Sequence, residues 1–412
     1  MARARQGQCW NFAHLEQIES AIAACREAGD IFAAAGDQEG EAHSLRTWAD
    51  AISPRDAPES IRLYQQALGI FRGIGSESGT AVVLNNLGLI YDAQDDPATA
   101  EKMHRQALAG FRLVGNKNAQ SKALGNIADE RLEQGDLRQA LQFYEESQEL
   151  DREDTGRIAI ASYNIAAVHE LQGDLAGAKR GFEQALAIWQ KNGDQSSSAY
   201  SMWSLGDLLL QEADFAGARK MFDQALAIRS SAGEKIAIAE TQLELAELSL
   251  EDGRSPQDQV VAARKVIDVF QKQQAHDDEI DAWRLLSRAL LAESKAAAAK
   301  EAMQHARSLA AKSQNPKTRW AVAIDDARVV AAHSASGIAA GKELSEIIAQ
   351  SHTLGYRLIE LDARLALTEL EMRAEKTAEG RARLAAIEVD AKAIGYNLVA
   401  RKAATLGAEL DR

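Results

Sequence analysis

Apolar and small residues recur along the chain about every 40 residues, and within each period they follow a helical pattern. The apolar–small pair stands at Leu87-Gly88, Ile127-Ala128, Ile165-Ala166, Leu205-Gly206 and Leu245-Ala246. Apolar residues at positions i, i+3 and i+4, such as Leu205, Leu208 and Leu209, lie on one face of an α-helix. A fixed period of this length indicates a repeat architecture rather than several unrelated domains.

Two further markers share this period and divide each repeat into two helices. Polar breaks stand at Asp95-Asp96, Gly135-Asp136, Gly173-Asp174, Ala213-Asp214 and Gly253-Arg254, in steps of 40, 38, 40 and 40 residues. Ala-Leu pairs stand at Ala67-Leu68, Ala107-Leu108, Ala185-Leu186 and Ala225-Leu226. Glycine favours the left-handed conformation that ends a helix, aspartate caps the next helix, and Pro97 suits a first helical turn. Each period is therefore predicted to be a helix hairpin with small residues where its two helices cross.

The pattern resembles the tetratricopeptide repeat. The second repeat carries it as Leu87-Gly88, Tyr91, Ala100 and Ala107, and a later one as Leu205-Gly206, Ala218, Phe222 and Ala225. The usual period is roughly 34 residues, so the longer period here is similar to the variant found in kinesin light chains. The resemblance implies an all-α fold, a right-handed superhelical solenoid whose concave wall is lined by the first helix of each hairpin.

Extending the phase predicts about ten hairpins and a closing helix, so that residues 1–412 form one solenoid. The clearest repeats span 41–253, divergent repeats span 2–40 and 254–394, and the cap spans 395–412. Later first helices are expected at Asp277–Ser294, Lys317–Ala335 and Tyr356–Glu375, with partners at Ala296–Ser313, Ala339–Leu354 and Ala378–Ile394. Arg401, Lys402 and Glu409 would give the closing helix the polar outer face of a solubilising cap.

The front of the array has no equivalent cap. Cys9 falls at the small helix-crossing position of the first hairpin, and Trp10 and Phe12 lie beside it. Exposed ends of solenoids tend to stack, so we expect self-association through this end. We also expect the chain to be a piece of a longer protein, because it starts at a repeat boundary. Its C-terminal part resembles the tetratricopeptide regions of bacterial signalling proteins, notably serine/threonine kinases.

Charge and cysteine content limit the partners and the cellular compartment that the sequence predicts. The chain carries 61 acidic and 47 basic residues, a net charge of −14, whereas Pro316–Arg412 holds 14 of each sign, so the deficit belongs to residues 1–315. This acidic field disfavours nucleic acid and anionic membrane as partners. Two cysteines are too few for a disulfide framework and favour a reducing compartment. Without a long apolar stretch or a signal peptide, we expect a cytoplasmic location and no membrane span.

No pattern in the sequence indicates catalysis. The eight histidines lack metal-ligand spacing, and neither a nucleophile elbow nor a phosphate-binding loop is present. We therefore expect the protein not to be an enzyme and to need no cofactor or metal.

Binding residues are sought on the first helices. The residue before the apolar–small pair is Asn86, Asn126 and Asn164 in three consecutive repeats. An amide offers both donors and an acceptor, which suits an extended peptide backbone, and asparagines at the matching positions of kinesin light chains clamp peptide main chain. The alternative is that these amides cap or brace neighbouring helices.

Two more columns complete the expected groove. Tyr163 and Trp203 stand one position earlier, where they would flank an incoming side chain or belong to the core. Acidic residues occupy the columns that follow, at Asp92, Asp129, Glu170, Asp207 and Glu247. Lys122 is the one basic residue of these columns, which argues against the lysine- and arginine-lined clamp that binds acidic chaperone tails.

These columns favour a non-enzymatic scaffold that binds a protein or peptide ligand, an extended and partly basic segment, in its groove. One alternative is a regulatory, substrate-recruiting region of a larger bacterial signalling protein such as a kinase. A second is a direct sensor of a small peptide, which requires a conformational response.

Overall fold

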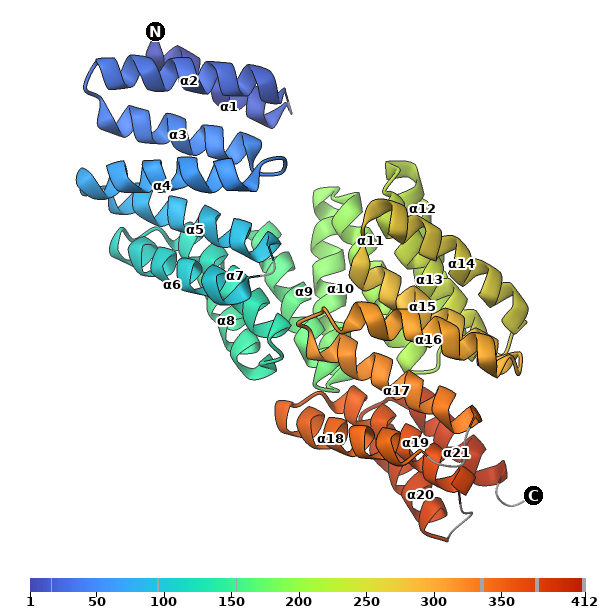
Figure 1. The fold of residues 1–412 in the computed structure, drawn as a ribbon. Helices are drawn as coiled ribbons and strands as arrows, with labels where there is room; N and C mark the ends of the chain where they lie inside the picture. Colours follow the sequence, from blue (N-terminus) through green and yellow to red (C-terminus); the bar gives the residue numbers. More distant parts are fainter. Residues whose placement is uncertain (16, 95, 153, 334–336, 375–377, 410–412) are drawn as a thin grey trace. The chain divides into compact units, whose positions relative to one another are not determined.

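The computed structural model describes residues 1–15, 17–94, 96–152, 154–333, 337–374 and 378–409. Every element in these ranges is helical (Figure 1). The helices are α1 (Ala2–His14), α2 (Ile18–Ala34), α3 (Gln38–Ile52), α4 (Ala57–Gly73), α5 (Glu77–Ala93), α6 (Pro97–Leu113), α7 (Lys117–Glu133), α8 (Leu137–Leu150), α9 (Thr155–Leu171), α10 (Leu175–Asn192), α11 (Gln195–Gln211), α12 (Phe215–Ala232), α13 (Lys235–Glu251), α14 (Pro256–Gln273), α15 (His276–Ala292), α16 (Ala296–Ala310), α17 (Pro316–His333), α18 (Ile338–Leu354), α19 (Arg357–Ala374), α20 (Ala378–Ala393) and α21 (Asn397–Glu409).

Ten hairpins followed by one closing helix account for these elements, which confirms the all-α repeat fold. The first helices predicted at Asp277–Ser294, Lys317–Ala335 and Tyr356–Glu375 correspond to α15, α17 and α19. The predicted endpoints Ala335 and Glu375, the marker residue Asp95 and the last three residues of the cap lie outside the described residues.

The turn chemistry follows the sequence markers. Gly173 has the left-handed φ of +79°, and the Asp174 side chain accepts a 2.8 Å hydrogen bond from the backbone N–H of Gly177 at the start of α10. Pro97 is the first residue of α6. At Ala213 the left-handed position is filled without glycine, at φ +61°. These caps satisfy helix-end groups that would otherwise lose their hydrogen bonds on burial.

Small residues let the two helices of a hairpin approach each other, as the pattern predicted. A Cβ atom on Gly88 would stand 2.5 Å from Cε1 of His104, and one on Gly206 would stand 2.6 Å from Cε1 of Phe222. In the first hairpin this position is Cys9, which is buried and joined to Cys25 by a disulfide between α1 and α2. The bonded pair differs from the reduced cysteines that a reducing compartment would favour.

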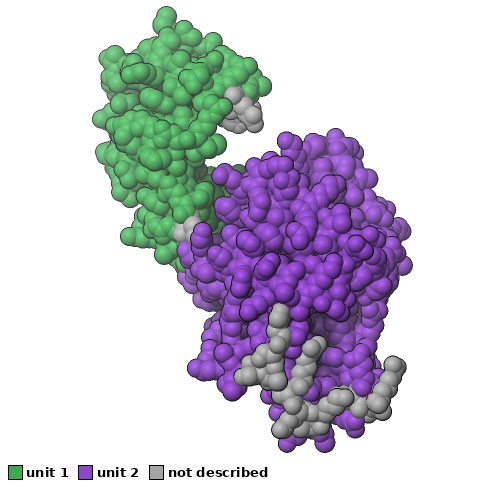
Figure 2. Space-filling view, turned by 45° about the vertical axis from the view of Figure 1, so that its right-hand side comes forward, with its two compact units in different colours: residues 1–130, 142–153 green, residues 131–141, 154–412 purple. Residues whose placement is uncertain are grey.

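The described residues form two compact units (Figure 2). Unit 1 contains residues 1–130 and 142–153, and unit 2 contains residues 131–141 and 154–412. In unit 1, Leu63, Phe71 and Val83 belong to a core of hairpin interfaces. No described helix has the length and apolar character needed to cross a membrane.

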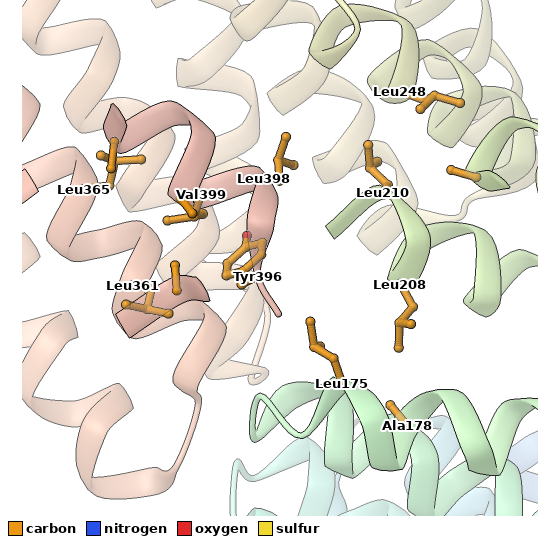
Figure 3. Packing of buried hydrophobic residues seen from close by; sticks show 14 of the residues in the cluster. Leu175, Ala178, Leu208, Leu210, Leu248, Leu361, Leu365, Tyr396, Leu398 and Val399 are labelled. Carbon is orange, nitrogen blue, oxygen red and sulfur yellow. The ribbon is translucent and has the colours of Figure 1, made fainter. Parts of the chain in front are cut away.

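Unit 2 has a core that joins distant parts of the sequence. Leu175, Leu208, Leu210 and Leu248 of α10, α11 and α13 share one cluster with Leu361, Leu365, Tyr396, Leu398 and Val399 of the C-terminal helices (Figure 3). Asn397 donates to the backbone oxygen of Glu212 at 3.2 Å, and Arg401 donates to that of Glu251 at 2.6 Å. The C-terminal helices therefore close back on α10–α13.

The closing helix differs from a solvated cap in one respect. Arg401 also stacks 4.7 Å from the Phe215 ring centroid, and Lys402 forms a 2.7 Å ion pair with Glu251. Glu409 is exposed, as expected of a polar outer face. The basic residues of α21 therefore bind earlier helices in part, and no local sequence pattern predicts this contact.

Candidate peptide-binding surface

Polar side chains on consecutive first helices bind one another, each with the residue one position before its equivalent in the preceding repeat. Hydrogen bonds join residues 41 positions apart, from Asn126 to Asn85 at 3.3 Å, between Tyr163 and Ser204 at 2.9 Å, and from Gln211 to Glu170 at 2.9 Å. Equivalent positions lie side by side because each repeat stacks on the one before it. Many of the polar side chains that were expected to bind a ligand therefore bind a neighbouring repeat instead.

The three predicted asparagines differ in their bonding. In unit 1, Asn86 donates to Asp50 at 2.9 Å, and Asn126 donates to Asn85. In unit 2, Asn164 has no side-chain hydrogen-bond partner among the described residues. Asn86 and Asn126 thus brace helices, and Asn164 keeps a free amide.

Both predicted aromatic residues, Tyr163 and Trp203, belong to unit 2 and pack against other residues of that unit. The Tyr163 ring lies 5.1 Å from Phe182 and 5.8 Å from Trp189, measured between centroids, while its hydroxyl pairs with Ser204. Trp203 is half-buried, and its Nε1 is buried with no hydrogen-bond partner. These contacts fit the core alternative better than the role of groove anchors.

Trp203 also contacts a residue that the sequence analysis missed. The Arg229 side chain is fully buried, with its guanidinium carbon 4.7 Å from the Tyr200 ring centroid and 5.8 Å from that of Trp203. Its Nη1 donates to the backbone oxygen of Ala237 at 2.9 Å and to Thr241 at 2.8 Å. A signal existed, because Arg229 occupies a column that elsewhere holds Phe71, Phe111, Trp189 and Phe270.

Two of the predicted acidic residues are held by partners within their units. In unit 1, Tyr144 donates its hydroxyl proton to Asp129, and burial raises the pKa of Asp129 to about 6 although the residue keeps accessible surface. In unit 2, Glu247 accepts a 2.6 Å hydrogen bond from Arg288. Neither carboxylate needs an outside cation.

Of the remaining predicted acids, Glu170 and Asp207 form a cluster with Glu244. Glu170, Asp207 and Glu244 belong to α9, α11 and α13 of unit 2, are half-buried, and have no ion pair with any described cation. Gln211 donates from its Nε2 at 2.9 Å to both Glu170 and Asp207. We call Glu170, Asp207 and Glu244 the acidic cluster.

Electrostatics make the acidic cluster hold protons. Burial raises the pKa of Glu170 and of Glu244 well above the ordinary range, and the charge of Asp207 raises both further. Burial also raises the pKa of Asp207, while its hydrogen bond with Glu170 lowers it. The hydrogen bond between these two side chains thus raises the pKa of Glu170 and lowers that of Asp207. Lys317 lowers all three pKa values without forming an ion pair.

Such a cluster is suited to accepting a cation. An ammonium or guanidinium placed among the three carboxyl groups would favour their charged forms and release protons. Charge-assisted hydrogen bonds from that group would replace the carboxyl–carboxylate bond.

Comparison with known proteins identifies the class of this protein. Tetratricopeptide-repeat models match residues 55–113, 121–154 and 157–231. Together with the hairpin geometry, these matches show that the chain contains tetratricopeptide repeats. No curated protein matches it by sequence.

Solved structures of similar fold include three bacterial proteins. The apo form of the quorum sensor NprR from B. thuringiensis is 14% identical over 73% of this chain and 86% of that one, with a TM-score of 0.59. A Rap protein complexed with competence and sporulation factor is 12% identical over 99% of both chains, at 0.55. Aspartyl phosphate phosphatase F from Bacillus subtilis is 14% identical over 92% of this chain and 95% of that one, at 0.53. At these identities the likeness shows the fold alone.

Proposed function

We propose that this protein is a non-enzymatic scaffold that binds an extended, basic segment of a protein or peptide on the first helices of unit 2. The observation that carries the proposal is the acidic cluster, three half-buried carboxyl groups on neighbouring helices without a paired cation. Buried charges are normally paired, so an unpaired acidic group on a concave wall marks a binding position for a cation.

Asn164 supplies the second element of recognition. Its amide can donate to and accept from a peptide main chain, and no described side chain occupies it. A lysine or arginine side chain would enter the acidic cluster while the backbone beside it bonds Asn164. Among the residues expected to bind, Asn164, Glu170 and Asp207 are the ones that remain open to a ligand.

The proposal is tested with an unstructured peptide in which lysine alternates with alanine, and with its glutamate counterpart. We expect the lysine peptide to bind and the glutamate peptide not to bind, measured by fluorescence anisotropy at about 0.1 M salt. The double variant Glu170→Gln/Glu244→Gln should weaken binding at least tenfold. Glu183→Gln, at an exposed position of α10, is the matched control and should bind like the wild type. Equal binding by the double variant would reject the acidic cluster as the site.

Self-association through the N-terminal end remains a separate proposal. Trp10 of α1 keeps 53% of its surface exposed, whereas Phe12 packs against the disulfide-linked pair. Sedimentation that depends on concentration, and loses that dependence in Trp10→Ser, would support it. A concentration-independent monomer would contradict it.

A further inference from the structure

A cavity of about 830 Å³ lies within unit 2, among the parallel helices α13, α15, α17 and α19 and the closing helix α21. Its size falls in the range of small-ligand pockets, roughly 300–1,000 Å³. It is separate from the acidic cluster, because none of Glu170, Asp207 and Glu244 belongs to its lining.

The lining is ordered in layers along the helix axes. Arg288, Arg328, Glu369 and Lys402 line one level of the cavity. Three or four residues further along the same helices stand Leu291, Ala331, Met372 and Leu406. Because these helices run in the same direction, one turn of about 5.4 Å separates a charged layer from an apolar layer. The cavity therefore has an apolar layer next to the charged one, and Glu409, three residues beyond Leu406, lines it on the far side.

The charged side chains that line the cavity balance one another. The cations are Arg288, Arg328 and Lys402, and the carboxylates are Glu251 and Glu369 of the charged layer and Glu409 beyond the apolar layer. Glu251 already accepts from Arg288 and Lys402, and Glu369 accepts from Arg328 at 3.1 Å. The carboxylates of this layer are thus engaged, and an additional cation would find poor partners there.

Hydrogen-bond donors in this layer remain available. Arg328 uses Nε and Nη1 for Glu369 and Asp325, so its Nη2 has no partner among the described residues. The Lys402 ammonium has three donors and one described bond. A ligand carboxylate can accept hydrogen bonds from these donors.

We propose that this cavity binds a small molecule that joins a carboxylate to an apolar body. The carboxylate lies at Arg328 and Lys402, and the apolar body fills the layer of Leu291, Met372 and Leu406. Two sources share this chemistry, the acyl chain of a carboxylic acid and the free C-terminus of an apolar peptide.

The test titrates the full chain with octanoate and with N-acetyl-leucyl-leucine by calorimetry, using octan-1-ol and the amidated dipeptide as neutral controls. We expect saturable binding of at least one carboxylate, at least tenfold tighter than that of its neutral control. Binding of octanoate alone supports the acyl source, and binding of the dipeptide alone supports the peptide source. Binding of neither overturns the proposal.

Two variants locate the site. Lys402→Met removes one cation and leaves Glu251 with Arg288, so we expect at least a tenfold loss of affinity. Ala292→Trp fills the apolar layer without changing charge and should abolish binding, whereas Ala297→Trp, on an exposed face of α16, should leave it unchanged. Because the two active variants act by different routes, misfolding of one still leaves the other as a test. Affinity unchanged in both Lys402→Met and Ala292→Trp places the ligand elsewhere and overturns the proposal.

Discussion

At the scale of single residues, burial and pairing decide which polar groups stabilise a repeat and which remain open to a ligand. The columns that contain Asn126, Tyr163 and Glu247 could be located from the period alone. Their bonding partners could not, because a bond between two first helices depends on both side chains and on the spacing of neighbouring repeats. Asn126 illustrates the point, since its amide donates to Asn85, a bond that the spacing of the asparagines does not predict.

Asp129 gives a test of burial in unit 1. Its pKa is raised by burial to about 6, from an ordinary value of 3.8. The folded state therefore binds this proton more tightly than the unfolded state, and the stability that it contributes at low pH is lost as pH rises from about 4 to about 6. Asp129→Asn should be more stable than the wild type at pH 7, with the difference shrinking toward pH 4. Thermal midpoints at several pH values measure it, and a constant difference would contradict it.

Arg229 gives a test in unit 2. Arg229→Ala should lower the free energy of unfolding by about 2–4 kcal/mol, because it removes a fully buried side chain together with its hydrogen bonds. Arg229→Phe should cost less, since the same column holds phenylalanine or tryptophan in five other repeats, Phe32 included. Denaturant titrations compare the two variants. A phenylalanine variant less stable than the alanine variant would show that the hydrogen bonds outweigh the packing.

At the scale of elements, the hairpins follow from local chemistry, whereas the contacts between distant hairpins do not. Gly173 and Gly253 both end a first helix with positive φ, so the sequence treats them alike. In the fold, a Cβ atom on Gly173 would stand 3.0 Å from Cβ of Arg357 and from Cδ1 of Ile394, whereas one on Gly253 meets nothing within 4 Å. Only Gly173 lies where the C-terminal helices close back.

This difference predicts unequal costs for the same substitution. Gly253→Ala should cost about 1 kcal/mol, the usual penalty of the left-handed conformation. Gly173→Ala should cost more, because the new methyl group also separates α9 from the C-terminal helices. The comparison uses the thermal midpoint and the amide exchange of Asn397–Ala400. Equal effects of the two variants would show that this contact contributes little to stability.

The disulfide between α1 and α2 acts on one hairpin. It links residues 16 apart, and a loop of this length stabilises by about 3 kcal/mol in the chain-entropy model. Reduction, or Cys25→Ser, should increase amide exchange in α1 and α2 and leave unit 2 unchanged. Exchange that is identical in oxidised and reduced protein would show that the hairpin is held by packing alone.

At the scale of the whole molecule, the sequence could predict an acidic binding surface but not its composition. The acidic columns are visible in the sequence pattern. The pattern does not show that Arg288, on the next first helix, binds Glu247, or that Glu244, in the column of the asparagines, belongs to the acidic cluster. Likewise, the amphipathic cavity exists because α21 packs near α13, and the two helices lie about 150 residues apart in sequence.

The closing helix should therefore matter beyond its own hairpin. Removing residues 396–412 would uncover Leu208, Leu210 and Leu248, which now share a core with Leu398 and Val399 (Figure 3). We expect greater binding of an apolar dye and a lower thermal midpoint of unit 2. Unchanged dye binding would mean that α21 is not needed to cover this core.

Proton release on binding tests the central claim most directly. If a lysine side chain enters the acidic cluster, it lowers the raised pKa values of Glu170 and Glu244, so those groups lose protons when the ligand binds. Calorimetry of the alternating lysine peptide in two buffers of different ionisation enthalpy should show proton release, and tighter binding as pH rises. Glu170→Gln/Glu244→Gln should abolish the release, and Glu183→Gln should preserve it. Binding without proton release, or release that persists in the double variant, would contradict the assignment of this site.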